Sequence, residues 1–202
     1  NIVPMDDRRE EGVKFFDLDP EKKTILLVGG SQGALGINRG ISAQLASFKD
    51  NDYQMIWQTG KPYYEKALKE VGENGLQDRI KCTVFIDRMD LAYAAADVVI
   101  SRAGAMSISE LSLLNKAVVF VPLPTAAEDH QTKNAMALVE KGAAAIVPDS
   151  EAVDKAMAVA LELVANNQEL ESLRENIAKL AISDAADRVV NEIEKELSKA
   201  QK

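Results

Sequence analysis

Apolar and polar positions change in blocks along the chain, and these blocks predict six short strands separated by helices. The strands are expected at residues 24–28, 53–58, 80–86, 97–100, 117–121 and 144–147. Residues 98–100 and 118–121 are apolar without a break, which is typical of strands covered on both faces. Strands that alternate with helices indicate an α/β fold, here a doubly wound, Rossmann-like sheet of six parallel strands.

Helical periodicity fills the intervals between the strands and continues after the last one. A short charged helix is expected at 6–16, and one continuous helix from the first glycine-rich turn to about residue 48. Three C-terminal helices are expected at 151–165, 169–180 and 184–200. Ligands of doubly wound sheets bind at the carboxyl ends of the strands, near the point where the strand order reverses. The residues that follow each strand are therefore the candidates for a site.

A glycine-rich turn follows the first strand, with Gly29, Gly30, Ser31 and Gly33 leading into a predicted helix. A helix N-terminus offers unpaired N–H groups and a positive dipole end, which suit a phosphate. The spacing fits neither a P-loop nor the G-x-G-x-x-G fingerprint. From these residues alone, a phosphate-binding turn and a plain strand-to-helix turn remain equally good interpretations.

A second glycine-containing turn follows the fourth strand. If a helix begins there at Gly104, the N–H groups of residues 104–107 form a second phosphate site, and the Glu110 carboxylate can accept hydrogen bonds from a ribose diol. Alternatively, Ser107 and Glu110 form a capping box at a later helix start. Arg102 would either add positive charge near a diphosphate or pair with a surface acid.

The loop after the fifth strand carries the only imidazole of the chain, His130, followed by two amide side chains. Gln131 and Asn134 are three residues apart, on one face of the next predicted helix. Amides donate and accept hydrogen bonds, which suits sugar hydroxyls, although a solvated first helical turn has the same composition. Together, the residues at the strand ends indicate an anionic, hydroxyl-rich ligand such as a nucleotide or a nucleotide sugar.

Composition and charge exclude several classes of function. The net charge of -8 over 202 residues argues against a nucleic-acid-binding protein and against a strong anionic-membrane patch. A single cysteine, Cys82, rules out an internal disulfide, and one cysteine with one histidine argue against a zinc site. No apolar run reaches the roughly 18 residues of a membrane span, so we expect a cytoplasmic protein. Because the first residue is Asn, we also expect a piece of a longer chain.

Several segments, in this order and spacing, resemble the MurG family of bacterial transferases. They are residues 29–34 (GGSQGA), 85–89 (FIDRM), 96–105 (ADVVISRAGA), 107–110 (SISE), 120–122 (FVP) and 130–135 (HQTKNA). Members of that family transfer N-acetylglucosamine from UDP-N-acetylglucosamine onto lipid-linked muramyl-pentapeptide during peptidoglycan synthesis. The resemblance covers the carboxyl-terminal half of the family and implies one half of a two-domain GT-B glycosyltransferase. Residues 21–202 would be the donor-binding domain, and residues 1–20 a junction segment with a short helix.

The resemblance also implies a role for each matching residue. Ser31 would contact the donor diphosphate, the Ile86 backbone would hold the uracil, and Glu110 would bind the ribose hydroxyls. The backbone N–H groups of Ala105, Met106 and Ser107 would bind the diphosphate, and this donor-binding segment would continue through Ile108 and Ser109. The side-chain amides of Gln131 and Asn134 would bind the sugar. Supporting positions would be Gly29, Gly30, Arg102 and Gly104. The implied reaction is an inverting displacement that requires no metal or other cofactor, because helix N-termini stabilise the departing UDP.

The chain departs from the family pattern in ways that limit the expected activity. The family's amino-terminal half, with the acceptor site and the proposed base, is absent, so this chain alone should not catalyse transfer. The lipid-linked acceptor, and peripheral association with the cytoplasmic face of the inner membrane, would depend on that half. The chain begins Asn1-Ile2-Val3-Pro4-Met5, and no arginine stands in the place where the family's Gly-Asn-Pro-Val-Arg stretch carries one. Ala117 stands at an expected proline.

Three other functions compete with this interpretation. One is another GT-B enzyme acting on a UDP-sugar, such as a UDP-N-acetylglucosamine 2-epimerase relative. Another is a non-catalytic nucleotide-binding subunit of a split glycosyltransferase. A dinucleotide oxidoreductase is disfavoured, because Gln58 and Thr59, rather than an acid, follow the second strand.

Overall fold

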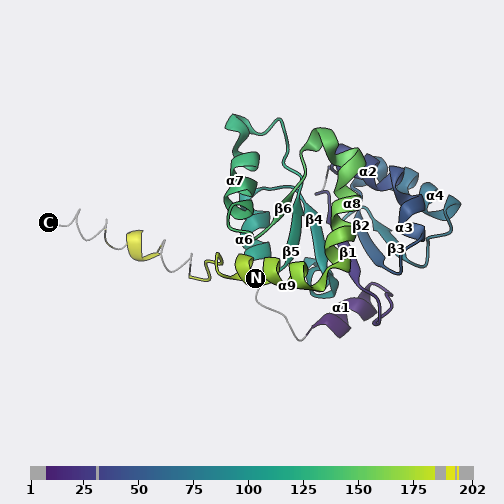
Figure 1. The fold of residues 1–202 in the computed structure, drawn as a ribbon, viewed down its shortest axis with the longest axis horizontal. Helices are drawn as coiled ribbons and strands as arrows, with labels where there is room; N and C mark the ends of the chain where they lie inside the picture. Colours follow the sequence, from purple (N-terminus) through teal and green to yellow (C-terminus); the bar gives the residue numbers. More distant parts are fainter. Residues whose placement is uncertain (1–7, 31, 185–189, 194, 196–202) are drawn as a thin grey trace.

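The structure is a computed structural model that describes residues 8–30, 32–184, 190–193 and 195. A six-stranded sheet in the order β3-β2-β1-β4-β5-β6 forms its centre (Figure 1). All five strand pairings are parallel. The strands are β1 (Thr24–Val28), β2 (Gln54–Gln58), β3 (Ile80–Thr83), β4 (Val98–Ser101), β5 (Ala117–Phe120) and β6 (Ala145–Ile146). The predicted doubly wound α/β fold is therefore confirmed, and the strand order reverses between β1 and β4.

Helices cover both faces of the sheet. One face packs against α2 (Leu35–Ala43), α3 (Leu45–Lys49), α4 (Tyr64–Glu73) and α8 (Ala152–Ala165). The other packs against α1 (Arg9–Phe15), α5 (Met89–Ala95), α6 (Ala105–Leu113) and α7 (His130–Val139). Helix α9 (Asn167–Ala178) contributes side chains to the hydrophobic cores on both faces of the sheet. Short 3₁₀ turns precede three helices, namely η1 (Lys61–Tyr63), η2 (Ala127–Asp129) and η3 (Asp149–Glu151).

The sequence of the central strand β1 is apolar without alternation because both of its faces are buried. Ile25 and Leu27 pack into the core beneath α2 and α8, whereas Leu26 packs into the core beneath α5 and α6. All three side chains are fully buried. Burying one such side chain contributes roughly 1.5–3 kcal/mol, so a strand covered on both faces gains stability at successive positions.

Three sequence-based boundaries were wrong, for local reasons. The single helix expected up to residue 48 breaks at Gln44, whose backbone is not helical and whose side-chain amide donates to the Asp154 carbonyl at 2.6 Å. Strand β3 ends at Thr83 instead of residue 86, because its partner β2 ends at Gln58, opposite Thr83. Strand β6 comprises only Ala145–Ile146.

Two expected terminal helices are only partly within the described residues. Most of the helix expected at 184–200 lies outside them, as do the first residues of the helix expected at 6–16. The remainder of that N-terminal helix is α1. In the part of the chain that the structure describes, no helix is long and apolar enough to cross a membrane.

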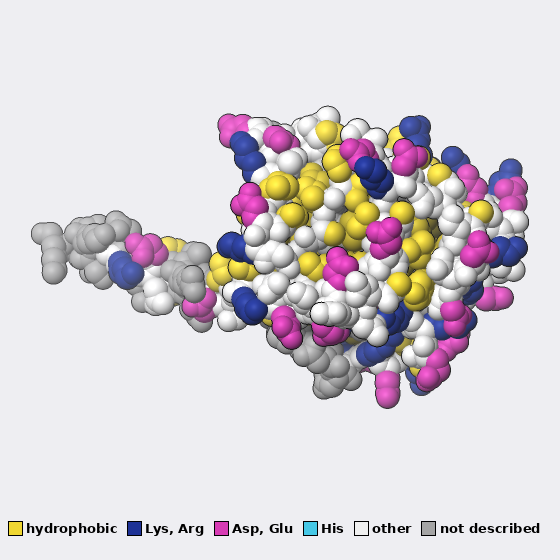
Figure 2. All heavy atoms as spheres, in the orientation of Figure 1, with side chains coloured by type: hydrophobic (Ala, Val, Ile, Leu, Met, Phe, Trp, Pro, Cys, Tyr) yellow, Lys and Arg dark blue, Asp and Glu magenta, His cyan; other side chains and the backbone are white. Residues whose placement is uncertain are grey.

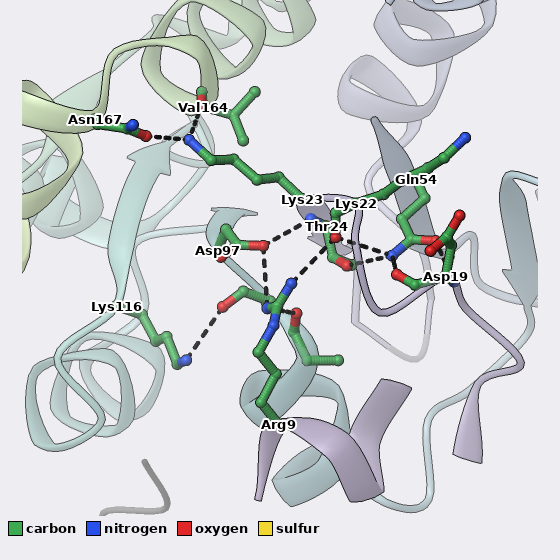
Figure 3. A network of polar contacts seen from close by, with 12 residues as sticks. Arg9, Asp19, Lys22, Lys23, Thr24, Gln54, Asp97, Lys116, Val164 and Asn167 are labelled. Carbon is green, nitrogen blue, oxygen red and sulfur yellow. Dashed lines mark hydrogen bonds and ion pairs between the residues drawn. The ribbon is translucent and has the colours of Figure 1, made fainter. Parts of the chain in front are cut away.

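The amino-terminal edge of the sheet is closed by contacts within the protein (Figure 3). The Asp97 carboxylate accepts hydrogen bonds from the Thr24 N–H at 2.8 Å and from Arg9 Nη1 at 3.1 Å. Lys116 Nζ donates to the Ala96 carbonyl at 3.1 Å, and Lys23 Nζ donates to the Val164 carbonyl at 2.8 Å. Since these polar groups already have partners, the opposite edge is the better place for a ligand.

Candidate functional site

Two turns lie next to each other at the carboxyl edge of the sheet, where the strand order reverses. The β1–α2 turn follows Val28, and the β4–α6 turn follows Ser101, which is the register partner of Val28. Each turn leads from a buried strand into a helix of nine residues. Both predicted phosphate-binding turns are therefore brought together, as expected for a site at the switch point.

Internal contacts hold the β1–α2 turn tightly. The Gly30 N–H donates to Gln58 Oε1 at 2.9 Å, and the Gly33 N–H donates to the Gly30 carbonyl at 3.0 Å. Gly30 and Gly33 both have a φ of +74°, which favours glycine. A Cβ added at Gly33 would lie 2.4 Å from the Thr59 carbonyl oxygen. Ser31, predicted to contact the diphosphate, lies outside the described residues.

The N-terminus of α2 already has a carboxylate beside it. A Cβ added at Gly36, in the first turn of α2, would lie 3.0 Å from Asp149 Oδ1. The same oxygen pairs with Arg102 Nη1 at 2.5 Å, and that nitrogen also donates to the Val121 and Pro122 carbonyls. Of the two roles predicted for Arg102, pairing with an acid is therefore the one observed. Its charge is balanced inside the protein.

The β4–α6 turn is built differently. Gly104 has extended dihedrals and is the N-cap, so α6 begins at Ala105. The predicted capping box at Ser107 and Glu110 is wrong, because the helix starts two residues before Ser107. Among the described residues, nothing accepts a hydrogen bond from the backbone N–H of Ala105, Met106 or Ser107. The first turn of α6 has no acidic residue, so this positive helix end is open.

The early start of α6 places Glu110 in the second helical turn, where it is half-buried. Its Oε2 accepts a hydrogen bond from the Tyr93 hydroxyl at 3.1 Å. Its Oε1 has no partner within the described part of the chain. Burial, together with the negative charge of Glu110, raises the pKa of Tyr93 well above its usual value. The phenol therefore stays protonated and donates to the carboxylate.

The neighbouring side chains of α6 have different surroundings. Ser109 is exposed, and its hydroxyl donates to the Ala105 carbonyl of the same helix at 3.0 Å. Ile108 packs against the core beneath α6. Met106 is 79% exposed. Among the described residues, the backbone N–H groups of Ala105, Met106 and Ser107, the Ser107 hydroxyl and Oε1 of Glu110 have no hydrogen-bond partner.

The β3–α5 loop contributes a buried residue with free backbone groups. Ile86 is 3% exposed, and neither its N–H nor its carbonyl has a hydrogen-bond partner among the residues described. Thr83 Oγ1 donates to the Phe85 carbonyl at 2.6 Å, which turns the chain away from the sheet after β3. An adjacent donor and acceptor on the backbone can pair with the edge of a base.

Helix α7 presents its two predicted amides toward neighbouring loops. Gln131 Oε1 accepts a hydrogen bond from the Leu123 N–H at 3.0 Å, and Asn134 Nδ2 donates to the Ala103 carbonyl at 3.5 Å. Each side-chain amide therefore makes one hydrogen bond inside the protein. The amide nitrogen of Gln131 and the amide oxygen of Asn134 remain available to a ligand. His130 is exposed and begins α7. The residues before it, Glu128 and Asp129, both have left-handed backbones.

A pocket of about 350 Å³ lies at the ends of β5 and β6, next to α7 and η3. Its lining is mostly apolar, with Asp129 and Asp149 among the polar lining residues; the apolar residues are Pro122, Pro124, Ile146 and Pro148. Figure 2 shows hydrophobic side chains gathered in the middle of the face that it presents, bordered by charged ones. Within the described residues, no three His, Cys, Asp or Glu side chains gather where a metal ion could be held.

Sequence reasoning missed three supporting side chains, Gln58, Tyr93 and Asp149. Gln58 is a buried polar residue at the end of an apolar strand, and that position was a usable signal. Tyr93 lies within an alanine-rich helix and resembles an ordinary core residue. Asp149 follows the last strand, but only the folded chain brings it to Arg102.

The chain matches the family model of the glycosyltransferase family 28 C-terminal domain over residues 24–189. It is 52% identical over 193 residues to a UDP-N-acetylglucosamine--N-acetylmuramyl-(pentapeptide) pyrophosphoryl-undecaprenol N-acetylglucosamine transferase of Parabacteroides distasonis, covering 95% of this chain and 52% of that protein. It is 54% identical over 190 residues to the protein of the same name from Bacteroides thetaiotaomicron, covering 93% and 51% respectively. The chain thus spans about half the length of these curated relatives.

Solved structures give the same picture. The MurG crystal structure from Acinetobacter baumannii superposes with a TM-score of 0.77 and 28% sequence identity, covering 96% of this chain and 55% of that one. A Staphylococcus aureus MnaA–UDP structure superposes with a TM-score of 0.64 at 16% identity, covering 93% and 48%, which shows the fold alone. The fold is that of one half of a GT-B glycosyltransferase. The chain belongs to the glycosyltransferase family 28 C-terminal domain family.

Proposed function

We propose that this chain is the donor-binding half of an inverting transferase that moves N-acetylglucosamine from UDP-N-acetylglucosamine onto lipid-linked muramyl-pentapeptide in peptidoglycan synthesis. Residues 21–202 are the donor-binding domain, and residues 1–20 are a junction segment. The observation that carries the proposal is the open N-terminus of α6, which stands one turn before a carboxylate with a free oxygen. The names of the two relatives supply the donor and the acceptor.

The diphosphate binds at the N-terminus of α6. The N–H groups of Ala105, Met106 and Ser107 donate to its oxygens, and the helix dipole favours its negative charge. Donors fixed in the backbone stabilise the charge that develops on the departing UDP without reorganising during the reaction. Arg102 joins this turn to the end of β5 by donating to the Val121 and Pro122 carbonyls, and Asp149 balances its charge.

The nucleoside lies between the β3–α5 loop and α6. The free N–H and carbonyl of Ile86 pair with the acceptor and donor on the uracil edge. The two ribose hydroxyls donate to Glu110. Hydrogen bonds to an ionised group contribute about 1.5–3 kcal/mol each, so this carboxylate is a major source of affinity.

The sugar lies against the N-terminus of α7. The free amide nitrogen of Gln131 and the free amide oxygen of Asn134 bind its hydroxyls. The hydrogen bonds that each amide makes inside the protein fix the orientation of the groups that remain. The β1–α2 turn borders the diphosphate from the other side, and Ser31 of this turn is the residue that the family resemblance assigns to the diphosphate.

Transfer requires the half of the enzyme that precedes this domain. An acceptor hydroxyl attacks the anomeric carbon from the face opposite UDP, the bond from that carbon to the diphosphate oxygen breaks, and a base removes the hydroxyl proton. The base, the lipid-linked acceptor site and peripheral attachment to the cytoplasmic face of the membrane belong to the other half. This chain alone binds the donor and transfers nothing.

Titration calorimetry of the 202-residue chain with UDP-N-acetylglucosamine and with UDP tests the proposal. We expect saturable binding of both, and a loss of roughly tenfold in affinity for Glu110→Ala. Glu171→Ala is the matched control, because Glu171 is an exposed carboxylate on α9 that pairs with Arg174 at 3.0 Å. No heat with either ligand at millimolar concentration would contradict the proposal.

A further inference from the structure

The polar contact between α5 and α6 joins a buried tyrosine to the carboxylate of the candidate site. Tyr93 is 2% exposed, and its hydroxyl donates to Glu110 Oε2 at 3.1 Å. We propose that Tyr93 is a positioning residue that makes the site select ribonucleotides over 2′-deoxyribonucleotides, by holding one oxygen of Glu110 and leaving the other for the ribose. This inference rests on the proposed function, because it assumes that Glu110 binds the ribose.

The direction of the hydrogen bond is fixed by chemistry. An ionised carboxylate only accepts hydrogen bonds, so the phenol must donate. Burial removes water as an alternative partner for the phenol, and an unsatisfied buried hydroxyl is unfavourable. The Tyr93 hydroxyl therefore stays on Glu110 Oε2, whether or not a ligand is bound.

The tyrosine is itself held in a fixed place. Helix α1 packs closely on α5, since a Cβ added at Gly12 would lie 2.4 Å from the Leu91 carbonyl oxygen. Arg9 Nη1 donates to the Ala95 carbonyl at 2.8 Å, which fastens the other end of α5. A tyrosine ring has only two side-chain torsions, so its hydroxyl position follows from the placement of the helix backbone.

A glutamate in this position would otherwise be a poor selector. Its three flexible torsions must be ordered when a ligand binds, at a cost in conformational entropy. Because the Tyr93 hydroxyl already holds Oε2, the entropic cost of ordering the Glu110 side chain arises when the chain folds and not when the ligand binds. The ribose hydroxyls then donate to Oε1 of a carboxylate that is already in place. A rigid acceptor discriminates strongly against a ligand that lacks one hydroxyl, whereas a mobile acceptor re-orients to the hydroxyl that remains.

The test measures binding of UDP and of 2′-deoxy-UDP by calorimetry in a set of variants. For the original chain, we expect a preference for UDP of about tenfold. Tyr93→Phe should reduce the preference to about threefold, and Glu110→Ala should abolish it. Adding Tyr93→Phe to Glu110→Ala should change neither affinity, because the tyrosine acts only through the carboxylate.

Tyr63→Phe provides the matched control. Tyr63 is 6% exposed, and its hydroxyl shares a hydrogen bond of 2.8 Å with Ser42 Oγ in the opposite core. It therefore loses a buried hydroxyl of the same kind at a place remote from Glu110, and it should keep the tenfold preference. Urea denaturation of every variant verifies that each is folded at the temperature of the titration.

Three outcomes would overturn the inference. An unchanged preference in Tyr93→Phe would show that Glu110 needs no support from it. An equal loss in Tyr63→Phe would show a general loosening of the fold instead of a local effect. If the original chain does not bind UDP, the proposed function fails and this inference falls with it; if UDP binds and only the Tyr93→Phe result disagrees, the proposed function stands.

Discussion

The β1–α2 and β4–α6 turns are neighbours at one edge of the sheet, but their backbone N–H groups have different partners. In the first turn, Gly30 donates to Gln58 and Gly33 donates to Gly30, while Asp149 lies beside the first turn of α2. In the second turn, no described residue accepts from the first three N–H groups of α6. The first turn of α2 therefore has a protein carboxylate beside it, whereas the first turn of α6 carries no acidic residue.

The difference teaches that glycines and a helix start do not by themselves make an anion site. The first turn has three glycines within five residues, and the second has only Gly104. Gly29 and Gly33 allow close packing against the end of β2, because a Cβ at Gly29 would lie 2.8 Å from the Gln58 carbonyl oxygen and one at Gly33 would lie 2.4 Å from the Thr59 carbonyl oxygen. Whether a helix N-terminus is available to a ligand depends on whether the protein already supplies its anion.

The largest effect is expected from a substitution that breaks the packing of the first turn. Gly33→Ala combines a positive φ with a contact of 2.4 Å to the Thr59 carbonyl, and it should lower the free energy of unfolding by about 3 kcal/mol. Gly30→Ala is the control, because Gly30 has the same φ of +74° with open space around it. It should cost only about 1 kcal/mol. Urea denaturation measures both, and equal losses would mean that close packing does not shape this turn.

Removing the anion beside α2 should have a smaller effect. Asp149→Asn leaves Arg102 without its charged partner, in a pair whose side chains are 18% and 24% exposed, and it should destabilise the fold by about 2 kcal/mol. Glu151→Gln, which disrupts the exposed pair with Lys155, should have a much smaller effect, because solvent screens exposed pairs. UDP affinity should stay within about twofold in both variants. A large loss of UDP affinity in Asp149→Asn would place the Arg102–Asp149 pair in the binding site.

A pair of proline substitutions tests the two helix ends directly. Proline is tolerated at the first position of a helix and removes one N–H there. Ala105→Pro should weaken UDP binding by about tenfold, because α6 loses a donor to the diphosphate. Leu35→Pro removes the equivalent N–H from α2 and should leave the affinity unchanged. Both preceding residues have extended dihedrals that accommodate a following proline. Calorimetry with UDP compares them, and equal losses would show that both helix ends hold the ligand.

The smallest effect concerns the tyrosine that supports Glu110 in the second turn. Because the folded pKa of Tyr93 lies above its unfolded value near 10, an unfolded chain releases this proton first as the pH rises. The stability contributed by the neutral phenol is complete below that unfolded value and is lost above it. The unfolding free energy should therefore fall by about 1 kcal/mol more in the original chain than in Tyr93→Phe between about pH 9 and about pH 11. Parallel pH profiles of the two proteins would contradict the shifted pKa.

The order of strands and helices could be predicted from the sequence, because each element carries its own periodic signal. Uninterrupted apolar runs marked the buried strands, and glycines and prolines marked the turns between them. Element ends were less accurate, since they depend on partners. Strand β3 stops where β2 stops, and the helix after the first turn breaks where Gln44 reaches across to the start of α8.

The candidate site divides in the same way. By itself, the sequence determined which turns lie at the carboxyl edge and which carboxylate and amides follow them, because parallel strands bring all their ends to one edge. Only the tertiary structure decided which polar groups are free. Asp149 and Arg102 are 47 residues apart, and Tyr93 and Glu110 are 17 apart. A hydrogen bond between distant residues depends on how helices and loops pack, and no local pattern of residues records that packing.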